Sequence, residues 1–280
     1  MRIRSHDLAV CSWSLPAAGM REMVQSVGEL GLSHVQLALA PLLFLDDKQK
    51  HFELGQLRAS ELSVTAGMIS FPGEDYSTLA RIKITGGFVP DETWDLRRQL
   101  TVAAGKLARE LGLTLLTTHV GFIAPSDHED YPKLLKRVSE VAANLADAGI
   151  TLAMETGQET ASELLQFLND LPARNVGVNF DPANLILYGS GDPIEAIETL
   201  DRHIRHVHIK DAVASENPGM DWGRMVPIGS GQVDFQEFLI ALNAVGYSGP
   251  LAIEQESDRR RVEDVRATID FLKSLDMPGD

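Results

Sequence analysis

The stretch TLAMETGQETASELLQFLNDLPARNVGVNFD, residues 151–181, contains one complete unit of the fold. It begins with a short apolar run, Thr151–Glu155, and ends with a second one, Val176–Asp181. Between these runs Thr160 and Glu163 have the spacing of a capping box, which marks the start of a helix. A strand, a helix and a second strand in this order are typical of parallel sheets, because the chain must cross over before it can pair in the same direction.

The same alternation continues on both sides of this unit. Eight short apolar or β-branched runs are separated by loops and helical patterns: Leu8–Ser12, His34–Leu39, Ser63–Ile69, Thr114–Val120, Thr151–Glu155, Val176–Asp181, Ile204–Ile209 and Pro250–Glu254. Such an alternation over roughly 250 residues predicts an α/β fold, a parallel (β/α)₈ TIM barrel. Glycine and proline do not gather into a linker, so we expect one domain over residues 1–280. Residues Phe71–Val89 fit the scheme poorly and are expected to form a long loop.

Several helical patterns carry their own start and stop signals. One apolar stripe at the helical period ends before Gly112 and consists of Leu96, Leu100, Ala103, Leu107 and Leu111. A second stripe ends before Gly149, and glycine is common just after the last residue of a helix. Asp192 and Asp234 precede two further helical patterns and are expected to cap them.

The composition excludes several classes of protein. The 40 acidic and 25 basic side chains give a net charge of -15, which would repel a nucleic-acid backbone. The single cysteine, Cys11, cannot form a disulfide framework or a cysteine-based zinc site. The longest apolar stretch, Val35–Leu45, is interrupted by Gln36 and Pro41 and is too short to cross a bilayer. Without a secretory-type leader, the chain is expected to be cytoplasmic, with a small-molecule ligand and no membrane partner.

The last four predicted strands each deliver a polar side chain that can bind a metal ion, namely Glu155, Asp181, His208 and Glu254. In a TIM barrel the carboxyl ends of the strands surround the mouth where chemistry takes place. Taken singly, Glu155 could be a solvated loop residue, Asp181 the start of an Asx turn, and an inward histidine a hydrogen-bonded core residue. As a set they predict a metal site, because three unpaired carboxylates at one mouth repel each other and a divalent cation removes that repulsion.

The ligand types indicate which ion this is. Carboxylate oxygens with one imidazole suit one divalent cation with open positions for substrate oxygens, and we favour Mn²⁺ over Mg²⁺, Co²⁺ or Zn²⁺. By the period of two in a strand, His206, His208 and Lys210 share one face.

These residues resemble a known superfamily. Phe-Asp-Pro-Ala-Asn at 180–184, His-Val-His-Ile-Lys-Asp at 206–211 and Ala-Ile-Glu at 252–254 stand in the order found in xylose-isomerase-like proteins. The stretches 154–159, 179–192 and 227–235 are similar to the sugar phosphate isomerase/epimerase branch. The resemblance covers nearly the whole chain. It extends to ketose 3-epimerases, hydroxypyruvate isomerase and inosose dehydratase, so it specifies fold and metal more closely than substrate.

The resemblance implies that Glu155 and Glu254 are both metal ligands and the acid/base pair. A proton next to a carbonyl is removed more easily when a metal polarises that carbonyl and holds the resulting enediolate. Return of a proton to the opposite face inverts a stereocentre, whereas relocation between neighbouring carbons gives aldose–ketose isomerisation. Both outcomes stay open.

Further residues are candidates for contacting the substrate: His119, Asn184, Gln158, Lys210, Trp222 and Arg224. His119 ends a strand where similar proteins place a substrate-binding histidine, and a loop hydrogen bond is the ordinary alternative. Asn184 stands where ketose 3-epimerases carry a histidine, which weighs against a free ketose. Lys210 could instead form an ion pair with Asp211 or Glu256.

Other residues bear on the shape of the pocket. Trp13 and Phe122 would form apolar walls for a sugar ring if they face the mouth. Gly229-Ser230-Gly231 could cradle a phosphate, or it could be an ordinary turn before a capped helix.

Four functions compete for this pattern. The first is a metal-dependent isomerase or epimerase of a sugar or sugar derivative, and the alternative is an inosose-type keto-polyol dehydratase, which begins with the same proton abstraction. An endonuclease-IV-like DNA-repair nuclease would need several metals, and Asn184, His206 and the acidic charge weigh against it. A non-catalytic sugar-binding barrel would require inert carboxylates. By the resemblance, a homodimer or homotetramer is expected.

Overall fold

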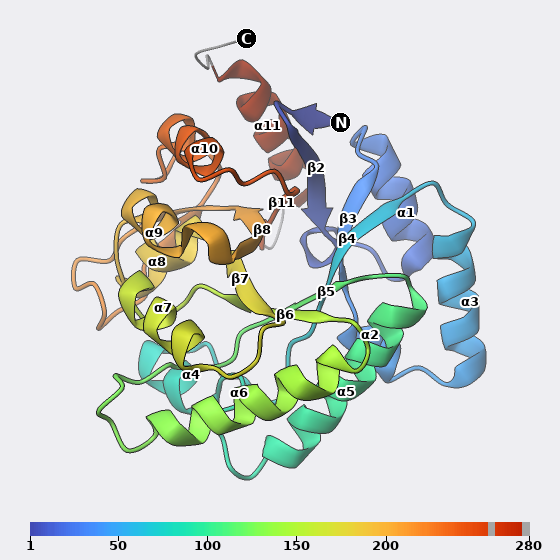
Figure 1. Cartoon of the computed structure of the whole chain (residues 1–280). Helices are drawn as coiled ribbons and strands as arrows, with labels where there is room; N and C mark the ends of the chain where they lie inside the picture. Colours follow the sequence, from blue (N-terminus) through green and yellow to red (C-terminus); the bar gives the residue numbers. More distant parts are fainter. Residues whose placement is uncertain (257–260, 276–280) are drawn as a thin grey trace.

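Parallel strands close into a barrel that is surrounded by helices (Figure 1). The computed structural model describes residues 1–256 and 261–275. Within these residues the strands follow one another around the barrel in the order β2, β3, β4, β5, β6, β7, β8 and β11, and β11 pairs with β2 to close the ring. Every pairing within the ring is parallel. The predicted TIM barrel is therefore confirmed.

The strands are short and lie where the alternation predicts them. The barrel strands are β2 (His6–Cys11), β3 (His34–Ala38), β4 (Ser63–Met68), β5 (Leu115–Thr118), β6 (Thr151–Glu155), β7 (Val176–Phe180), β8 (Ile204–Ile209) and β11 (Leu251–Ile253). Three further strands lie outside the ring: β1 (Arg2–Ile3), β9 (Asp211–Val213) and β10 (Arg224–Val226). β1 pairs antiparallel with β2, and β9 and β10 form a separate antiparallel pair after β8.

The helices cover the outside of the barrel. They are α1 (Met20–Glu29), α2 (Ala40–Leu43), α3 (Asp47–Arg58), α4 (Leu79–Thr85), α5 (Trp94–Glu110), α6 (Tyr131–Ala146), α7 (Ala161–Asp170), α8 (Pro182–Tyr188), α9 (Pro193–Leu200), α10 (Phe235–Ala244) and α11 (Arg261–Ser274), with 3₁₀ turns η1 (Ser12–Ser14) and η2 (Asp201–His203). The expected caps are present, since Thr160 forms a capping box on α7, and Asp192 and Asp234 cap α9 and α10. None of the described helices is long and apolar enough to cross a membrane.

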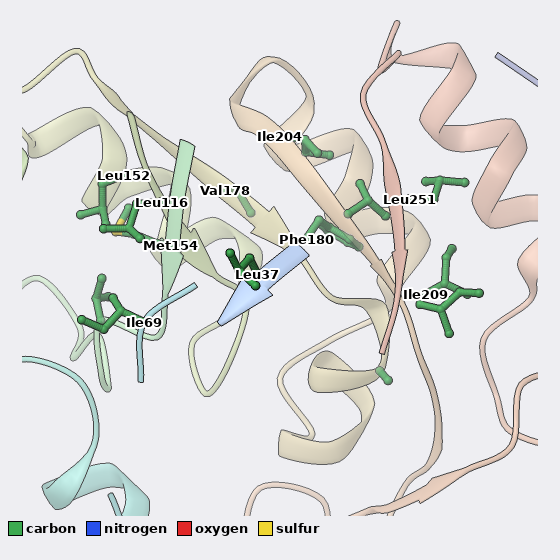
Figure 2. Packing of buried hydrophobic residues seen from close by; sticks show 14 of the residues in the cluster. Leu37, Ile69, Leu116, Leu152, Met154, Val178, Phe180, Ile204, Ile209 and Leu251 are labelled. Atoms are coloured by element: carbon green, nitrogen blue, oxygen red, sulfur yellow. The ribbon is translucent and has the colours of Figure 1, made fainter. Parts of the chain in front are cut away.

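Most large apolar side chains lie between the strands and the helices, and Leu115, which packs with Ala66 and Ala153, lies inside the barrel. Leu152, Met154, Val178 and Phe180 belong to this outer core (Figure 2). Because side chains alternate along a strand, the neighbouring positions point into the barrel. Apart from Leu115, those positions carry small or polar side chains, among them the buried Ala9, Cys11, Gln36, Ala66, Thr117, Ala153, Asn179, His206, His208 and Ala252. The polar interior directly underlies the mouth of the barrel.

The segment between β4 and α5 contains more structure than the expected loop. Phe71–Val89 includes the short helix α4, which Thr78 caps by accepting a hydrogen bond from the backbone N–H of Arg81. The side chain of Arg97, on α5, is buried beneath this segment. Its guanidinium donates to the carbonyl oxygens of Thr85 at 2.7 Å and Gly87 at 2.6 Å. A buried cation therefore holds the segment against the barrel.

The predicted stripe on α5 is partly wrong for the same reason. Leu96 is 50% exposed, whereas Arg97, Thr101, Ala104 and Leu107 lie on the buried face. Backbone carbonyls of the overlying segment require hydrogen-bond donors, and a buried arginine can satisfy several of them at once. That requirement turns Arg97 inward and Leu96 outward.

Replacing Arg97 is expected to destabilise the protein. The substitution Arg97→Met keeps the length of the side chain but leaves buried carbonyl oxygens without donors, which should lower the free energy of unfolding by about 2–3 kcal/mol. The matched control is Arg98→Met, since Arg98 makes only looser ion pairs with Asp95 and Glu140 at 3.9 and 3.4 Å. Its effect should stay below about 0.5 kcal/mol. Urea unfolding followed by circular dichroism measures both, and equal losses would contradict the role given to Arg97.

Candidate metal centre

Four potential metal ligands meet at the mouth of the barrel. Glu155 is the last residue of β6, Asp181 follows β7, His208 lies in β8 and Glu254 follows β11. The strands β6, β7, β8 and β11 are consecutive neighbours in the barrel. One ligand atom from each residue lies within 4.8 Å of all the others, and all four residues are buried. The structure thus brings together the four residues that the sequence singled out.

The local structure of Asp181 leaves one carboxylate oxygen free for a ligand. Asp181 caps α8, and its Oδ1 accepts hydrogen bonds from the backbone N–H groups of Ala183 at 2.9 Å and Asn184 at 3.1 Å. Pro182 in the first turn of α8 has no N–H of its own to satisfy. The other oxygen, Oδ2, is buried, has no hydrogen-bond partner among the described residues, and lies 3.4 Å from the ammonium of Lys210. The turn therefore fixes the carboxylate with Oδ2 toward the cluster.

His208 is oriented by a glutamine from the opposite part of the sequence. Its Nε2 lies 2.7 Å from Oε1 of Gln36, in β3. Gln36 is itself held by Thr117, which accepts a hydrogen bond from Nε2 of Gln36 at 2.9 Å. An amide oxygen can only accept, and the amide nitrogen of Asn179 lies farther from Nε2, at 3.2 Å, so the proton is assigned to Nε2 of His208, and Nδ1 would present its lone pair to a bound metal ion. Nδ1 is buried, has no hydrogen-bond partner within residues 1–256 and 261–275, and lies 3.1 Å from Oε2 of Glu254.

The donor set fits a divalent metal ion. Two buried atoms without hydrogen bonds, Oδ2 of Asp181 and Nδ1 of His208, lie 3.6 Å apart. Burial would lower the pKa of His208, but Cys11, Glu254 and Glu155 raise it well above its usual value. Such a shift means that the cluster attracts positive charge, and a divalent ion supplies more of it than one imidazolium. Three carboxylates and an imidazole are also a familiar set of metal ligands.

Amide and imidazole groups surround the carboxylate of Glu155. Its Oε1 accepts from Nδ2 of Asn184 at 3.1 Å and lies 3.4 Å from Nε2 of His119, while Oε2 accepts from Nδ2 of Asn179 at 3.2 Å. Burial would raise the pKa of Glu155, but His119 and His208 lower it below its usual value. The carboxylate is therefore held in its ionised form.

Glu254 is bound from two sides. Its Oε1 accepts from Nε1 of Trp13 at 2.6 Å, and its Oε2 lies 3.0 Å from Nζ of Lys210. Burial would raise the pKa of Glu254, but Lys210 and His208 lower it well below the usual value. Lys210 also lies 3.4 Å from Oδ2 of Asp181 and 3.8 Å from Glu256. Glu254 is therefore the main partner of Lys210. Glu256, one of the two partners that the sequence suggested, lies farther from the ammonium.

A cavity of about 640 Å³ opens directly beside the cluster. It is lined by Trp13, Ala38, Met68, Ser70, Glu74, Tyr76, His119, Glu155, Asn184, Leu187, Tyr188, Lys210, Trp222, Gly223, Met225, Glu254 and Glu256. His119, Asn184, Lys210 and Trp222 thus lie where substrate contacts were expected. Gln158 lines a much smaller adjoining cavity, which it shares with His119 and Glu155.

Two expected contacts do not reach the mouth. Arg224 is exposed in β10, and its neighbours Gly223 and Met225 line the cavity instead. Phe122 packs under the ammonium of Lys83, 3.9 Å from the ring centre, and is not a wall of the cavity. In both cases the loop that contains the residue borders the cavity, but the side chain itself is not part of the cavity lining.

The glycine loop at 229–231 is not a phosphate cradle. Oδ2 of Asp211 accepts from the backbone N–H groups of Gly229 at 3.0 Å and Gly231 at 2.8 Å, and Oδ1 accepts from Val233 at 3.1 Å. These are the donors that a phosphate would need. Because a buried carboxylate of the same chain already takes them, the ordinary turn is the correct interpretation.

Sequence reasoning missed the polar interior that supports the cluster. Nδ1 of His206 lies 2.9 Å from Oδ1 of Asn179, and burial lowers the pKa of His206 to about 3, so this histidine is neutral. Gln36 and Thr117 complete the network around His208. The available signal was a polar residue at an inward position of an otherwise apolar strand, since such a residue must find a buried partner.

Removing the acceptor for His208 is expected to weaken metal binding. In Gln36→Leu, the ring of His208 loses the hydrogen bond that fixes its tautomer, and the affinity for Mn²⁺ should fall about 10–100-fold. The substitution Gln36→Glu keeps an acceptor at the same place and should bind Mn²⁺ at least as tightly as the parent. Calorimetric titration of metal-free protein measures both. A Gln36→Leu variant with parental affinity would show that Gln36 is only a packing residue.

Comparison with known proteins gives the same picture of the fold. The family model of the xylose isomerase-like TIM barrel matches residues 23–275. A xylose isomerase domain protein from Planctomyces limnophilus superposes with a TM-score of 0.85 at 29% identity, covering 96% of this chain and 95% of that one. A xylose isomerase-like TIM barrel protein from Mycobacterium smegmatis, solved in complex with magnesium, has a TM-score of 0.72 at 19% identity, covering 98% and 99% of the two chains. At this lower identity the likeness concerns the fold alone.

Curated relatives include two kinds of enzyme. A ketose 3-epimerase of Arthrobacter globiformis is 23% identical over 282 residues, covering 98% of this chain and 90% of the relative. An inosose dehydratase of Geobacillus thermodenitrificans is 26% identical over 145 residues, covering 46% of this chain and 48% of the relative. An uncharacterized protein of Methanocaldococcus jannaschii is 27% identical over 180 residues, covering 59% of each chain. The chain thus spans about half the length of some curated relatives and nearly all of another.

Proposed function

Because the chain belongs to the xylose isomerase-like TIM barrel family, we propose that it is a divalent-metal-dependent isomerase or epimerase of a sugar or sugar derivative. The observation that carries the proposal is the buried cluster of Glu155, Asp181, His208 and Glu254 beside a cavity that can hold a small molecule. The net charge of -15 supports a small-molecule substrate over nucleic acid. A cytoplasmic location and a homodimer or homotetramer are part of the same proposal.

The four residues of the cluster would hold one divalent ion, with Mn²⁺ favoured over Mg²⁺, Co²⁺ and Zn²⁺. When bound, the ion would polarise the substrate carbonyl and stabilise negative charge on its oxygen. The supporting residues prepare the site for this role. Gln36 and Asn184 keep His208 and Glu155 in place through hydrogen bonds of 2.7 and 3.1 Å.

Glu155 and Glu254 are proposed as the acid/base pair. They lie on β6 and after β11, the outer two of the four neighbouring strands, so they approach the cavity from different sides. Both are held ionised by neighbouring cations or imidazoles. One carboxylate removes the proton from the carbon next to the carbonyl. The other first takes up a proton from water in the cavity and returns it to the opposite face or to the neighbouring carbon, and the first carboxylate then releases its proton to water.

The remaining cavity residues are proposed as substrate contacts. His119 and Lys210 can donate hydrogen bonds to substrate oxygens, and Asn184 and Gln158 offer amides. Trp222 presents an aromatic surface at the side of the cavity, against which part of the substrate can pack. Arg224 has no part in this proposal, because its side chain is exposed outside the cavity.

A dehydratase of a keto-polyol is the second candidate, and Lys210 favours it. Its buried ammonium lies 3.0 Å from Oε2 of Glu254 and can protonate a leaving hydroxyl, which departs as water after the first proton is removed. Burial would lower the pKa of Lys210, but Glu254 and Asp181 raise it well above its usual value. A raised pKa makes the Lys210 ammonium a weaker acid, so the isomerase or epimerase remains the first candidate.

The proposal is tested by incubating the Mn²⁺-loaded protein with candidate ketoses, keto-glycosides and inososes in deuterated water. Nuclear magnetic resonance then identifies which carbon-bound proton exchanges. Exchange next to a carbonyl, with an epimer or isomer as product, is the expected result. An α,β-unsaturated or diketone product would establish the dehydratase instead. Absence of exchange with all three classes, in protein that binds Mn²⁺, would overturn both.

A further inference from the structure

The cavity beside the cluster is larger than one sugar ring requires. Its volume of about 640 Å³ lies well inside the range of roughly 300–1,000 Å³ that pockets for drug-sized ligands have. Glu155, Glu254 and Lys210 border it at the strand ends, and residues of the surrounding loops form its sides. A single keto sugar bound at the cluster would fill only part of this space.

The sides of the cavity carry an aromatic wall, formed by Tyr76, Tyr188 and Trp222. Tyr76 lies in the segment after β4, and Trp222 lies between β9 and β10. The ring centres of Tyr76 and Trp222 are 6.5 Å apart, and those of Tyr188 and Trp222 are 4.7 Å apart. Met68, Leu187 and Met225 also line the cavity. Segments from opposite sides of the barrel thus form one largely apolar surface of tilted aromatic rings.

The charged side chains that line the cavity are either negative or already paired with other residues of the chain. Lys210 is the one Lys or Arg among the lining residues described by the structure, and it is paired with Glu254 and Asp181. Glu74 accepts from the backbone N–H groups of Phe71 at 3.0 Å and Gly87 at 2.8 Å, so it holds its own loop together. The lining also contains the carboxylates of Glu155, Glu254 and Glu256. Among the described lining residues, a phosphate or carboxylate on the substrate would therefore meet repulsion from carboxylates and find no unpaired lysine or arginine.

We propose that the substrate is an uncharged keto sugar joined through a glycosidic bond to a flat apolar group. The sugar lies at the cluster, and the apolar group packs against the aromatic wall. Burial of apolar surface and ring stacking at Tyr76 and Trp222 supply the extra affinity. This substrate class rests on the proposed function, because the cluster must act on the sugar part.

The experiment compares three ligands that share one keto-hexose ring: the phenyl glycoside, the methyl glycoside and the methyl glycoside 6-phosphate. Calorimetry with the Mn²⁺-loaded protein measures the affinity for each. The phenyl glycoside should bind at least about tenfold more tightly than the methyl glycoside, which is about 1.4 kcal/mol. The phosphorylated ligand should bind most weakly.

Variants of the aromatic wall show where the apolar group binds. Trp222→Ala should reduce the phenyl-to-methyl affinity ratio toward one, and Tyr76→Ala should do the same. Because Tyr76 is 46% exposed, its replacement should leave the fold intact. The matched control is Trp94→Phe, because Trp94 packs against Phe88 and Arg137, outside the cavity lining. This variant should keep the parental ratio.

The outcomes separate this inference from the proposed function. Equal affinity for the phenyl and methyl glycosides, or tightest binding of the phosphate, overturns the substrate class. So does a parental ratio in both wall variants. Deuterium exchange on the same ligands tests the function independently. Exchange with no preference for the phenyl glycoside overturns the substrate class alone, and the predicted order of affinities without any exchange overturns the function alone.

Discussion

The substitution Glu254→Gln is expected to lower kcat by at least about 10³-fold, since general acid–base catalysis alone contributes 10²–10⁴-fold. The amide has nearly the shape of the carboxylate but cannot accept the proton, and it is a weaker metal ligand. The amide oxygen can accept from only one of Trp13 and Lys210, because these two donors bind different oxygens of Glu254, but both lie at the mouth of the barrel, so the fold should persist. The rate of deuterium exchange into the substrate measures the loss, and circular dichroism checks the fold. Glu155→Gln should behave in the same way.

A neighbouring carboxylate provides the matched control. Glu256 lies two residues after Glu254, 3.8 Å from the same ammonium of Lys210, but its side chain is 53% exposed and it is not part of the four-residue cluster. Glu256→Gln should therefore cost less than tenfold in kcat. If Glu254→Gln kept more than a tenth of the parental kcat, or if Glu256→Gln were the more damaging change, the acid/base assignment would be wrong.

Removal of the metal is expected to abolish activity, and Mn²⁺ should restore it. Dialysis against a chelator leaves the carboxylates of the cluster facing each other, with Lys210 and His208 as the remaining positive groups. Added Mn²⁺ should bind at one ion per chain. At a hundredfold excess over Kd it should stabilise the folded state by about 2.7 kcal/mol, which appears as a rise in Tm. Calorimetry and thermal unfolding both give readouts that do not depend on the substrate.

The variant Asp181→Asn tests the ligand set with little change to the backbone. An asparagine keeps the side-chain oxygen that caps α8 and replaces the free Oδ2 with an amide NH₂, which cannot bind a cation. The affinity for Mn²⁺ should fall at least about 100-fold, more than for Gln36→Leu, because Asp181 would contact the ion directly. Glu256→Gln serves as the control, because it removes a carboxylate of the same cavity that lies outside the ligand set. Unchanged Mn²⁺ affinity in Asp181→Asn would contradict the proposed centre.

Much of the barrel was predictable because its signals are local. The strand at Thr151–Glu155, the capping box at Thr160 and the caps at Asp192 and Asp234 each depend on residues within a few positions of one another. The resemblance to the xylose-isomerase-like superfamily is confirmed on the same residues. The error at Leu96 has the opposite origin, since the buried face of α5 is set by backbone carbonyls that lie 10 to 25 residues from Arg97 along the chain.

The sequence by itself determined the order of strands and helices, and it determined that Glu155, Asp181, His208 and Glu254 stand at the ends of the last four strands. Periodicity and capping are short-range properties, so they can be followed along one chain. Only the tertiary structure decided that the four groups converge within 4.8 Å, that Gln36 orients His208, and that Lys210 pairs with Glu254. These contacts join residues from distant strands, and closure of the barrel brings them together.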